Sequence, residues 1–349
     1  MHQHQLYIYI YIMLLDTLIK KNRSYTPIWF MRQSGRHLKE YKKLRNKEQN
    51  FINFCLNEKL VIESSLLPLK YYDLDAAILF SDILIIPWLL GQKVDFKQNH
   101  GPLLAPINFD TILKNSLKIN KVHCIGNAIK EIKNSLNKKK SLIGFAGAPW
   151  TLICYMIEGG TSKNFEKVRK HLWFENKLFF TLFNKLIYSV VDFLEFQANS
   201  GCDVLMIFDT WSHMIPNTYW NKLAIDPTRK IVQELRDRNI NCPIIGFPFK
   251  AGEKFVRYSY ESLVDVVSLD WSADLEWMER NINSEVALQG NLDPMILTQK
   301  NFNLLKNNVE KVLSILEKRV HIFNLGHGIT PEAKVESIIE IINCVRSTK

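Results

Sequence analysis

Residues 204–210 read VLMIFDT: an unbroken apolar run followed at once by an aspartate and a threonine. A run this short and this continuously apolar is typical of a parallel β-strand that is covered on both faces. The pattern recurs along most of the chain, which favours a sheet of buried parallel strands. The predicted strands are 27–31, 76–80, 142–146, 204–208, 244–248, 266–270, 286–290 and 321–325.

Helical patterns lie between these runs. Alternation of strands and helices implies parallel pairing with right-handed crossovers, and eight such units favour a closed (β/α)8 barrel. The alternative is an open, doubly wound sheet, but no glycine-rich phosphate-binding fingerprint follows any strand in the required form. Pro331 is expected in the first turn of the last helix. The clearest predicted helices are 58–71, 122–138, 165–197, 229–237, 303–318 and 332–346.

The chain of 349 residues is long enough for two ordinary domains, yet a single α/β barrel of this length is equally normal. No internal repeat or linker divides it, so we predict an α/β fold with one domain, a (β/α)8 TIM barrel over residues 13–349. Residues 1–12 precede a better amphipathic segment and are expected to be an extension outside the core. Residues 92–118 are rich in Asn, Pro and Gly and are predicted to be a barrel insertion, a hairpin or flap.

The net charge of +10 raises the question of nucleic acid, but the basic residues are scattered and form no recognised nucleic-acid module. Solvated lysines on helix faces explain them better, and attraction of an acidic small molecule is a third reading. The apolar start of the chain is too short to span a membrane and has no cleavage site. We therefore predict a cytoplasmic protein that binds neither membrane nor nucleic acid. Its widely spaced cysteines are expected to be buried thiols: Cys55, Cys124, Cys154, Cys202, Cys242 and Cys344.

In a barrel, the residues that follow the strands gather at one rim, where active sites lie. These positions carry arginine, carboxylate, hydroxyl and imidazole groups. They are Arg32, Ser81, Asp82, 147–150, Asp209, Thr210, Lys250, Trp271, Asn291, Gly326 and His327.

Arg32 and Arg36 are the sharpest candidates for binding. A guanidinium stays charged and presents a planar fork of donors that matches a carboxylate or a phosphate. With Gly35 between them, the two arginines could hold anions in a bidentate manner. The alternative, a structural ion pair with Glu40 or another carboxylate, is about as common in proteins.

The other candidates each have a plain structural alternative. Asp82 could cap a helix or form an ion pair, but beside two arginines its pKa is expected to fall, which would keep it ionised. His327 lies between glycines that permit a close approach of a ligand. Tyr155 and Thr210 could simply be packed residues with satisfied hydroxyls. No grouping of Cys, His or Met residues indicates a metal site.

Six segments together resemble the uroporphyrinogen decarboxylase family, in order and with compatible spacing from about Pro27 to the last helix. They are FMRQSGRHLKEY, DAAILFSDIL, GFAGAPWTLICYMIEGGTSKNF, IFDTWS, GNLDP and HIFNLGHGITPE. The resemblance implies a (β/α)8 barrel that works without a cofactor, usually as a homodimer whose clefts face each other. It implies removal of the four acetate carboxylates of uroporphyrinogen III as CO2, giving coproporphyrinogen III in haem biosynthesis.

The resemblance also implies roles for individual residues. Asp82, Arg32 and Arg36 would be catalytic: Asp82 would stabilise a cationic pyrrole ring, and the arginines would orient carboxylates. The substrate-binding residues implied by the matching segments are Arg32, Gln33, Ser34, Gly35, Arg36, Asp82, Tyr155, Thr210 and His327.

The chain departs from the family pattern at Ser34, Lys39, Trp88, Thr210 and His213, and none of these changes removes a proposed catalytic residue. Two other functions are compatible with the barrel. One is a corrinoid or coenzyme methyltransferase, which would need zinc held by His and Cys ligands. The other is a tetrapyrrole-binding protein without catalytic activity. The arginine segment and the missing cysteines at the strand ends favour the decarboxylase.

Overall fold

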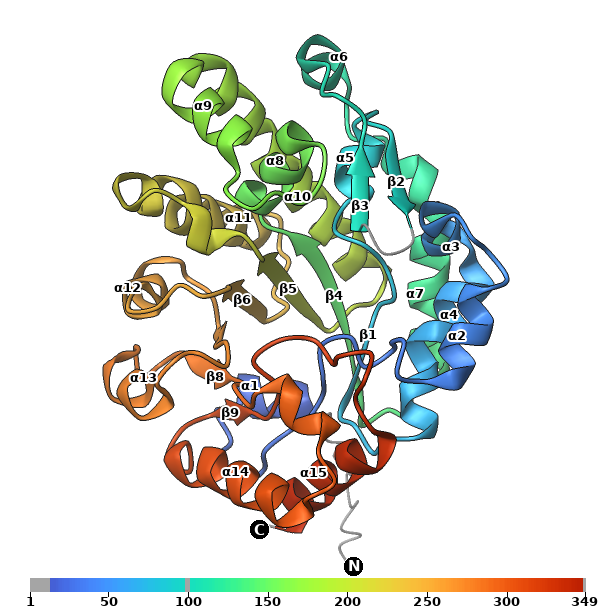
Figure 1. Ribbon diagram of the computed structural model, residues 1–349, viewed down its shortest axis with the longest axis vertical. Coiled ribbons are helices and arrows are strands. Elements are labelled where there is room, and N and C mark those ends of the chain that lie inside the picture. The colour runs from blue at the N-terminus through green and yellow to red at the C-terminus, as the bar shows by residue number, and fades with distance from the viewer. Residues whose placement is uncertain (1–12, 98–100, 348–349) are drawn as a thin grey trace, which may run out of the picture.

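Seven parallel strands form a curled sheet with helices on its outside (Figure 1). The computed structural model describes residues 13–97 and 101–347. Every neighbouring pair in the order β1-β4-β5-β6-β7-β8-β9 is parallel. The predicted α/β barrel is confirmed. The strands are β1 (Ala76–Ile78), β4 (Ser141–Gly147), β5 (Val204–Asp209), β6 (Ile244–Pro248), β7 (Val266–Ser268), β8 (Ala287–Gln289) and β9 (His321–Ile322).

The first apolar run closes the sheet between β9 and β1, but it is not a strand. Of the predicted strand 27–31, only Ile28 forms a parallel bridge, to Phe323. On the other side, the Ile28 carbonyl accepts a hydrogen bond of 2.8 Å from the Asp75 backbone N–H. Pro27 has no N–H to donate, which shortens any regular pairing at this point. The prediction was therefore right about the position of this run and wrong about its conformation.

Side-chain amides replace the missing strand pairing around this run. The Gln33 amide accepts from the Phe30 N–H at 3.1 Å and donates to the Ala76 carbonyl at 3.1 Å. The Asn324 amide oxygen accepts from the Met31 N–H at 3.3 Å. Buried backbone groups need such partners, and here two side chains supply them.

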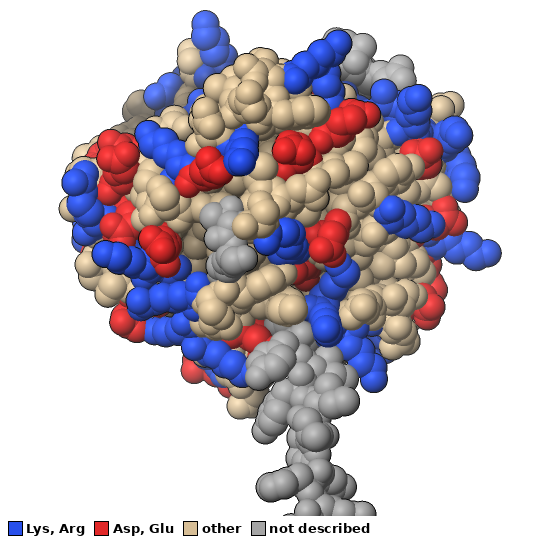
Figure 2. All heavy atoms as spheres, turned by 90° about the horizontal axis from the view of Figure 1, so that it is seen from below, with Lys and Arg blue, Asp and Glu red and all other residues tan. Residues whose placement is uncertain are grey.

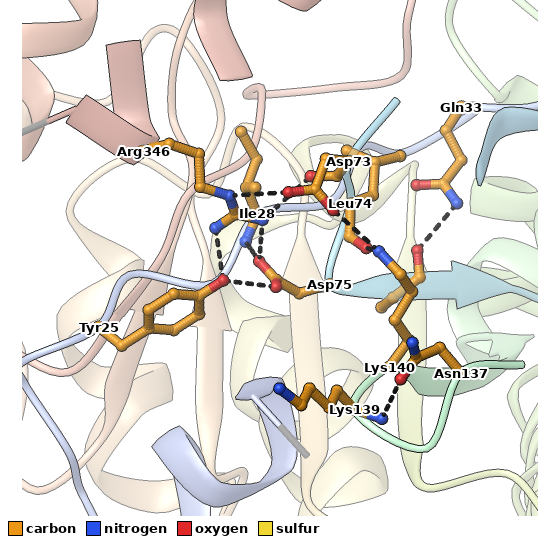
Figure 3. A network of polar contacts seen from close by, with 11 residues as sticks. Tyr25, Ile28, Gln33, Asp73, Leu74, Asp75, Asn137, Lys139, Lys140 and Arg346 are labelled. Carbon is orange, nitrogen blue, oxygen red and sulfur yellow. Dashed lines mark hydrogen bonds and ion pairs between the residues drawn. The ribbon is translucent and has the colours of Figure 1, made fainter. Parts of the chain in front are cut away.

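A buried carboxylate ties this run to the last helix (Figure 3). Asp75 accepts hydrogen bonds of 2.6 Å from the Ile28 N–H and from the Tyr25 hydroxyl, and one of 2.9 Å from Arg346. Arg346 also donates to the Tyr25 hydroxyl at 2.6 Å. Burial, reinforced by Asp75, raises the pKa of Tyr25, so its hydroxyl remains a donor. The start of β1, the first run and the C-terminal helix are thus held at one point.

The later strands end earlier than predicted: β7 and β9 stop at Ser268 and Ile322. Asparagine side chains and an isolated bridge carry the connection further. The Asn291 amide donates to the Asp270 carbonyl at 2.9 Å, and Leu292 pairs with Leu325. The sheet therefore opens into irregular backbone at the barrel mouth.

The observed helices differ in their bounds from all six predicted ones, most of all over 58–71 and 165–197. The stretch 165–197 is two helices that break at Glu175, and 58–71 passes into a 3₁₀ turn at Leu67–Lys70, where Pro68 interrupts the α-helix. Pro331 lies in a turn before the last helix. The helices are α1 (Met13–Ile19), α2 (Lys39–Arg45), α3 (Phe51–Leu56), α4 (Glu58–Leu66), α5 (Ile85–Leu89), α6 (Phe109–Lys114), α7 (His123–Ser135), α8 (Pro149–Glu158), α9 (Glu166–Phe174), α10 (Asn176–Ser200), α11 (Asp226–Asp237), α12 (Lys254–Glu261), α13 (Leu275–Asn281), α14 (Phe302–Ile315) and α15 (Val335–Ser347).

The insertion after β1 contains the expected hairpin. Strands β2 (Val94–Lys97) and β3 (Gly101–Leu104) are antiparallel. The hairpin docks on the end of α8, because the Leu104 N–H donates to the Gly159 carbonyl at 2.9 Å. Gly160 lies at φ 156°, and a Cβ there would be 2.8 Å from the Pro102 carbonyl oxygen. The close approach brings the hairpin over the barrel mouth.

Apolar side chains fill two regions, one inside the barrel and one between sheet and helices. Leu14 of α1 packs with the inner group, so this helix covers the amino end of the barrel. None of the six cysteines, all of which lie in the described residues, forms a disulfide, but Cys124 and Cys242 are only partly buried, against expectation. Residues 1–12 lie outside the described residues. Within the described ranges, no helix is long and apolar enough to cross a membrane.

Charges of both signs mix on the surface face shown in Figure 2, where lysine and arginine lie among aspartate and glutamate. On this face the basic excess forms no continuous patch.

The Asp75–Arg346 pair yields a test of barrel closure. Changing Arg346→Met leaves the buried Asp75 carboxylate without its cation, and we expect a loss of about 3 kcal/mol in the free energy of unfolding. The matched control is Arg238→Met, which removes a more exposed cation from Asp192 and Glu195 and should cost about 1 kcal/mol or less. Urea unfolding followed by circular dichroism measures both, and equal losses would contradict the role of Arg346.

Candidate active site

A cavity of about 380 Å³ opens at the carboxyl end of the barrel. Its walls come from the strand ends, from the loop after the first run and from the β2–β3 hairpin. Phe145, Phe208 and Phe247 contribute apolar surface. Six of the predicted site residues line it together: Arg32, Ser34, Asp82, Tyr155, Thr210 and His327.

Arg32 is held in an unusual backbone conformation by the glycines near it. Its φ of 58° lies in the left-handed region, which L side chains rarely adopt. A Cβ on Gly328 would be 2.4 Å from the Arg32 Cδ, and one on Gly35 would be 2.9 Å from the Arg32 carbonyl oxygen. Only glycine therefore lets the Arg32 stem lie along this part of the chain.

The guanidinium of Arg32 has no carboxylate partner. Within the described ranges, neither Arg32 nor Arg36 has a carboxylate oxygen within 4.0 Å, so the structural ion pair with Glu40 is not present. The side chain is open to the cavity, yet protein surrounds it on most sides, and this burial lowers the pKa of Arg32. Tyr155 and Asp82 oppose that shift. The result is an unpaired cation in a confined site.

Ser34 lines the cavity with Arg32, whereas the other residues of the arginine loop do not. The Gln33 side chain is fully buried and its amide hydrogen-bonds to the backbone of Phe30 and Ala76, so Gln33 stays a proposed substrate-binding residue through its backbone alone. Gly35 and Arg36 do not line the cavity either, and Arg36 is exposed. Arg36 is still close enough to Arg32 to help lower the pKa of Arg32.

The pKa of Asp82 is raised, whereas the sequence led us to expect a lowered one. One carboxylate oxygen accepts from the Leu84 N–H at 2.8 Å, in the turn before α5. The other has no hydrogen-bond partner among the described residues. Burial raises the pKa of Asp82 to about 6, because desolvation outweighs the attraction of Arg32. The carboxyl is thus ionised above about pH 6, not locked in its charged form.

Tyr155 and Thr210 stand beside a turn that a second buried carboxyl organises. The Thr151 hydroxyl donates to Asp209 at 2.6 Å and accepts from the Trp211 N–H at 3.1 Å. Burial raises the pKa of Asp209 to about 7 and that of Tyr155 to about 12. The Tyr155 phenol is therefore a hydrogen-bond donor at neutral pH.

His327 is neutral at ordinary pH. Burial, aided by Arg32 and Lys250, lowers its pKa to about 4. Its ring packs 4.9 Å from Phe249 and 6.0 Å from Trp271, measured between centroids. A Cβ on Gly326 would be 2.1 Å from the backbone nitrogen of Trp271, so this close approach of the two loops requires a glycine.

Some cavity residues were not among the predicted site residues. Ser81 lines the cavity, and its hydroxyl and that of Ser34 are buried with no hydrogen-bond partner in the part of the chain that the structure describes. The place of Ser81 after a predicted strand was the one available signal. The phenylalanines that line the cavity, Phe145, Phe208 and Phe247, could not be identified from the sequence, since an unbroken apolar run does not tell which side chains face inward. Within residues 13–97 and 101–347, no three His, Cys, Asp or Glu side chains gather to hold a metal ion.

A family model described as "Uroporphyrinogen decarboxylase (URO-D)" matches residues 13–348. The chain belongs to the uroporphyrinogen decarboxylase family. It is an enzyme, a decarboxylase. The chain is 39% identical to the uroporphyrinogen decarboxylase of Rickettsia akari (strain Hartford), over 94% of this chain and 97% of that protein. It is 39% identical to that of Rickettsia bellii (strain RML369-C), over 95% and 98%.

Solved structures support the fold of this family member. A methyltransferase from Methanosarcina mazei superposes with a TM-score of 0.79 over 97% of this chain and 98% of that one, at 13% identity. A putative vitamin B12-independent methionine synthase from Listeria monocytogenes gives 0.56 over 93% and 96%, at 10% identity. At such low identity the likeness concerns the barrel alone.

The raised pKa of Asp82 yields a test in the free energy of unfolding. The folded pKa of about 6 lies above the ordinary 3.8, so the folded form binds the proton more tightly than the unfolded one. The stability contributed by this proton is present at low pH and is lost as pH rises through 6. We expect the wild type to lose stability relative to Asp82→Asn between about pH 4 and 6, with little change in the difference above that.

Urea unfolding at a series of pH values measures this difference. Asp209 is present in both proteins, so its own titration cancels in the comparison. A difference independent of pH, or one of opposite sign, would contradict the raised pKa.

Proposed function

We propose that this enzyme removes the four acetate carboxylates of uroporphyrinogen III as CO2 and so produces coproporphyrinogen III for haem biosynthesis. The observation that carries the proposal is that one cavity holds two groups. Among the described residues the Arg32 guanidinium has no carboxylate partner, and only one Asp82 oxygen has a hydrogen-bond donor. The cation suits the anionic arm of such a substrate, and the carboxylate suits a pyrrole ring that becomes cationic. The family match names the substrate class that presents both.

Arg32 suits the arm that reacts. Its unpaired guanidinium would orient the carboxylate that departs, and an anion there would replace water at a confined cation. A four-ring molecule with eight carboxylates is larger than a cavity of about 380 Å³, so much of it would remain at the mouth. Arg36, exposed beside Arg32, would bind an arm there.

The reaction needs a place for the electrons of the breaking bond. A proton adds to a pyrrole ring carbon and makes the ring a cation. The bond between the arm's methylene and its carboxylate then breaks, CO2 leaves, and the electron pair flows into the ring. A second proton converts the methylene to methyl as the ring carbon returns its proton. The balance is one proton taken up for each CO2 released, without an organic cofactor.

Asp82 would stabilise the cationic ring. Its unpartnered oxygen would accept hydrogen bonds from pyrrole N–H groups. Its negative charge would stabilise the ring cation most strongly where the site excludes water. With a pKa of about 6 it is mostly ionised at neutral pH. Arginine is a poor acid, so the protons would come from water or another residue.

The neutral polar groups would position the substrate. Tyr155, Thr210, Ser34 and His327 offer hydrogen bonds around the cavity without adding charge. Gln33 and Gly35 would act through the backbone of the loop they hold. As the family resemblance implies, we propose a cytoplasmic homodimer that requires no cofactor, membrane or nucleic acid.

Anaerobic incubation of the purified protein with uroporphyrinogen III tests the activity. Chromatography after oxidation should show porphyrins with seven to four carboxylates, ending at four. Zinc analysis of the same sample separates the methyltransferase alternative, which needs tightly bound stoichiometric zinc. Absence of decarboxylated products would reject the proposal, whether the protein merely bound the tetrapyrrole or carried zinc.

Asp82→Asn tests the electrostatic role. The amide keeps the oxygen that accepts from Leu84 but loses the charge, so kcat should fall by roughly 10²–10³-fold. The wild type should show an acid limb near pH 6 in kcat/KM, which reports the pKa values of the free enzyme. Near-wild-type turnover by Asp82→Asn or Asp82→Ala would show that the carboxylate does not carry this role.

A further inference from the structure

Lys250 stands at the barrel mouth in a loop that the proposed mechanism does not use. It follows β6, at φ 58°, in the left-handed region. Its backbone N–H donates to a carboxylate oxygen of buried Asp270 at 2.9 Å. The other Asp270 oxygen accepts from the Ser272 N–H at 2.9 Å and from the Ser272 hydroxyl. The backbone under Lys250 is therefore fixed, and Asp270 is occupied by hydrogen bonds of its own.

The ammonium of Lys250 rests on aromatic rings. Its Nζ lies 5.5 Å from the centroid of Phe249 and 5.3 Å from that of Trp271. Such cation–π contacts hold a charge in place and leave its outer side free. Among the described residues no carboxylate oxygen lies within 4.0 Å of this Nζ, and the side chain is exposed. Lys250 is thus a fixed cation without an anion.

The same two rings join Lys250 to the cavity. Phe249 and Trp271 both contact His327, which lines the cavity wall. Lys250 helps to lower the pKa of His327 and that of His213, whose ring also contacts Phe249, so its positive charge acts on groups at the mouth. The charged and titratable groups around it are then His327, His213 and Asp270, and neither histidine competes for an anion in its neutral form.

The order of the barrel places Lys250 across the mouth from the arginine loop. The first run occupies the place between β9 and β1, and β6 is the fourth strand onward from it in a ring of eight positions. Arg32 and Arg36 follow the first run, whereas Lys250 follows β6. The mouth therefore has cations on opposite sides.

We propose that Lys250 binds a carboxylate of a substrate arm that stays outside the cavity, opposite the arms bound at the arginine loop. The inference rests on the proposed function for the identity of the ligand. A macrocycle with carboxylates around its whole edge fits cations on opposite sides of the opening better than a cluster on one side. Lys250 would raise affinity and set the orientation of the ring, without taking part in the bond changes.

Steady-state kinetics with uroporphyrinogen III test this role. Lys250→Met keeps most of the aliphatic stem and removes the charge, and we expect KM to rise roughly tenfold, as for loss of a charge-assisted contact, with kcat within about twofold. Lys250→Arg should recover most of the affinity. The salt dependence of KM should also be weaker in Lys250→Met, because one ion pair fewer is screened.

The matched control is Lys254→Met. The Lys254 Nζ also lies over an aromatic ring, 5.2 Å from the Trp220 centroid, but it has no link to His327. Its KM should equal that of the wild type within twofold. An equal rise of KM in both variants, or a fall in kcat alone for Lys250→Met, would overturn the proposal.

Binding of uroporphyrin, the oxidised octacarboxylate, tests the contact without turnover. Porphyrin fluorescence anisotropy should give a Kd for Lys250→Met roughly tenfold above that of wild type and Lys254→Met. Equal Kd values would overturn the role of Lys250 even in an active enzyme. Conversely, a wild type that binds uroporphyrin but releases no CO2 from uroporphyrinogen would overturn the proposed function and leave the Lys250 result standing.

Discussion

The run from Pro27 to Met31 closes the barrel, and the arrangement of the mouth depends on this closure. The run cannot pair as an ordinary strand, so the Asp75 carboxylate and the amides of Gln33 and Asn324 hold it in place. Arg32 comes immediately after it. A change in the closure would move Arg32, the one cation among the described residues that lines the cavity, although the residues involved lie partly at the opposite end of the barrel.

Burial favours the neutral form of three titratable groups that line the cavity. It raises the pKa of Asp82 and Tyr155 and lowers that of His327. Arg32 is the exception in effect, because a guanidinium remains charged even when its pKa falls. The site therefore presents a permanent cation, a carboxyl poised near pH 6 and neutral hydrogen-bonding groups. The proposed function needs these properties, an anion bound at Arg32 and a cation stabilised beside it by Asp82.

Much of this could be predicted from sequence because buried parallel strands leave a strong local pattern. Apolar runs located the sheet, and the polar residues after them located Arg32, Asp82, Thr210 and His327 at one rim. Local patterns do not describe how tertiary contacts are satisfied. Gln33 was assigned to a ligand because its loop was recognised, whereas the backbone around Ile28 needs its amide.

The pKa of Asp82 could not be predicted for a similar reason. The sequence places two arginines nearby, but the size of the desolvation depends on the walls of the cavity, which come from distant segments.

The most direct test of the role of Asp82 is a crystal structure of the protein with coproporphyrinogen bound. We expect the free Asp82 oxygen to lie about 2.9 Å from pyrrole nitrogens, with carboxylate arms on Arg32. A ring whose nitrogens face away from Asp82 would contradict it.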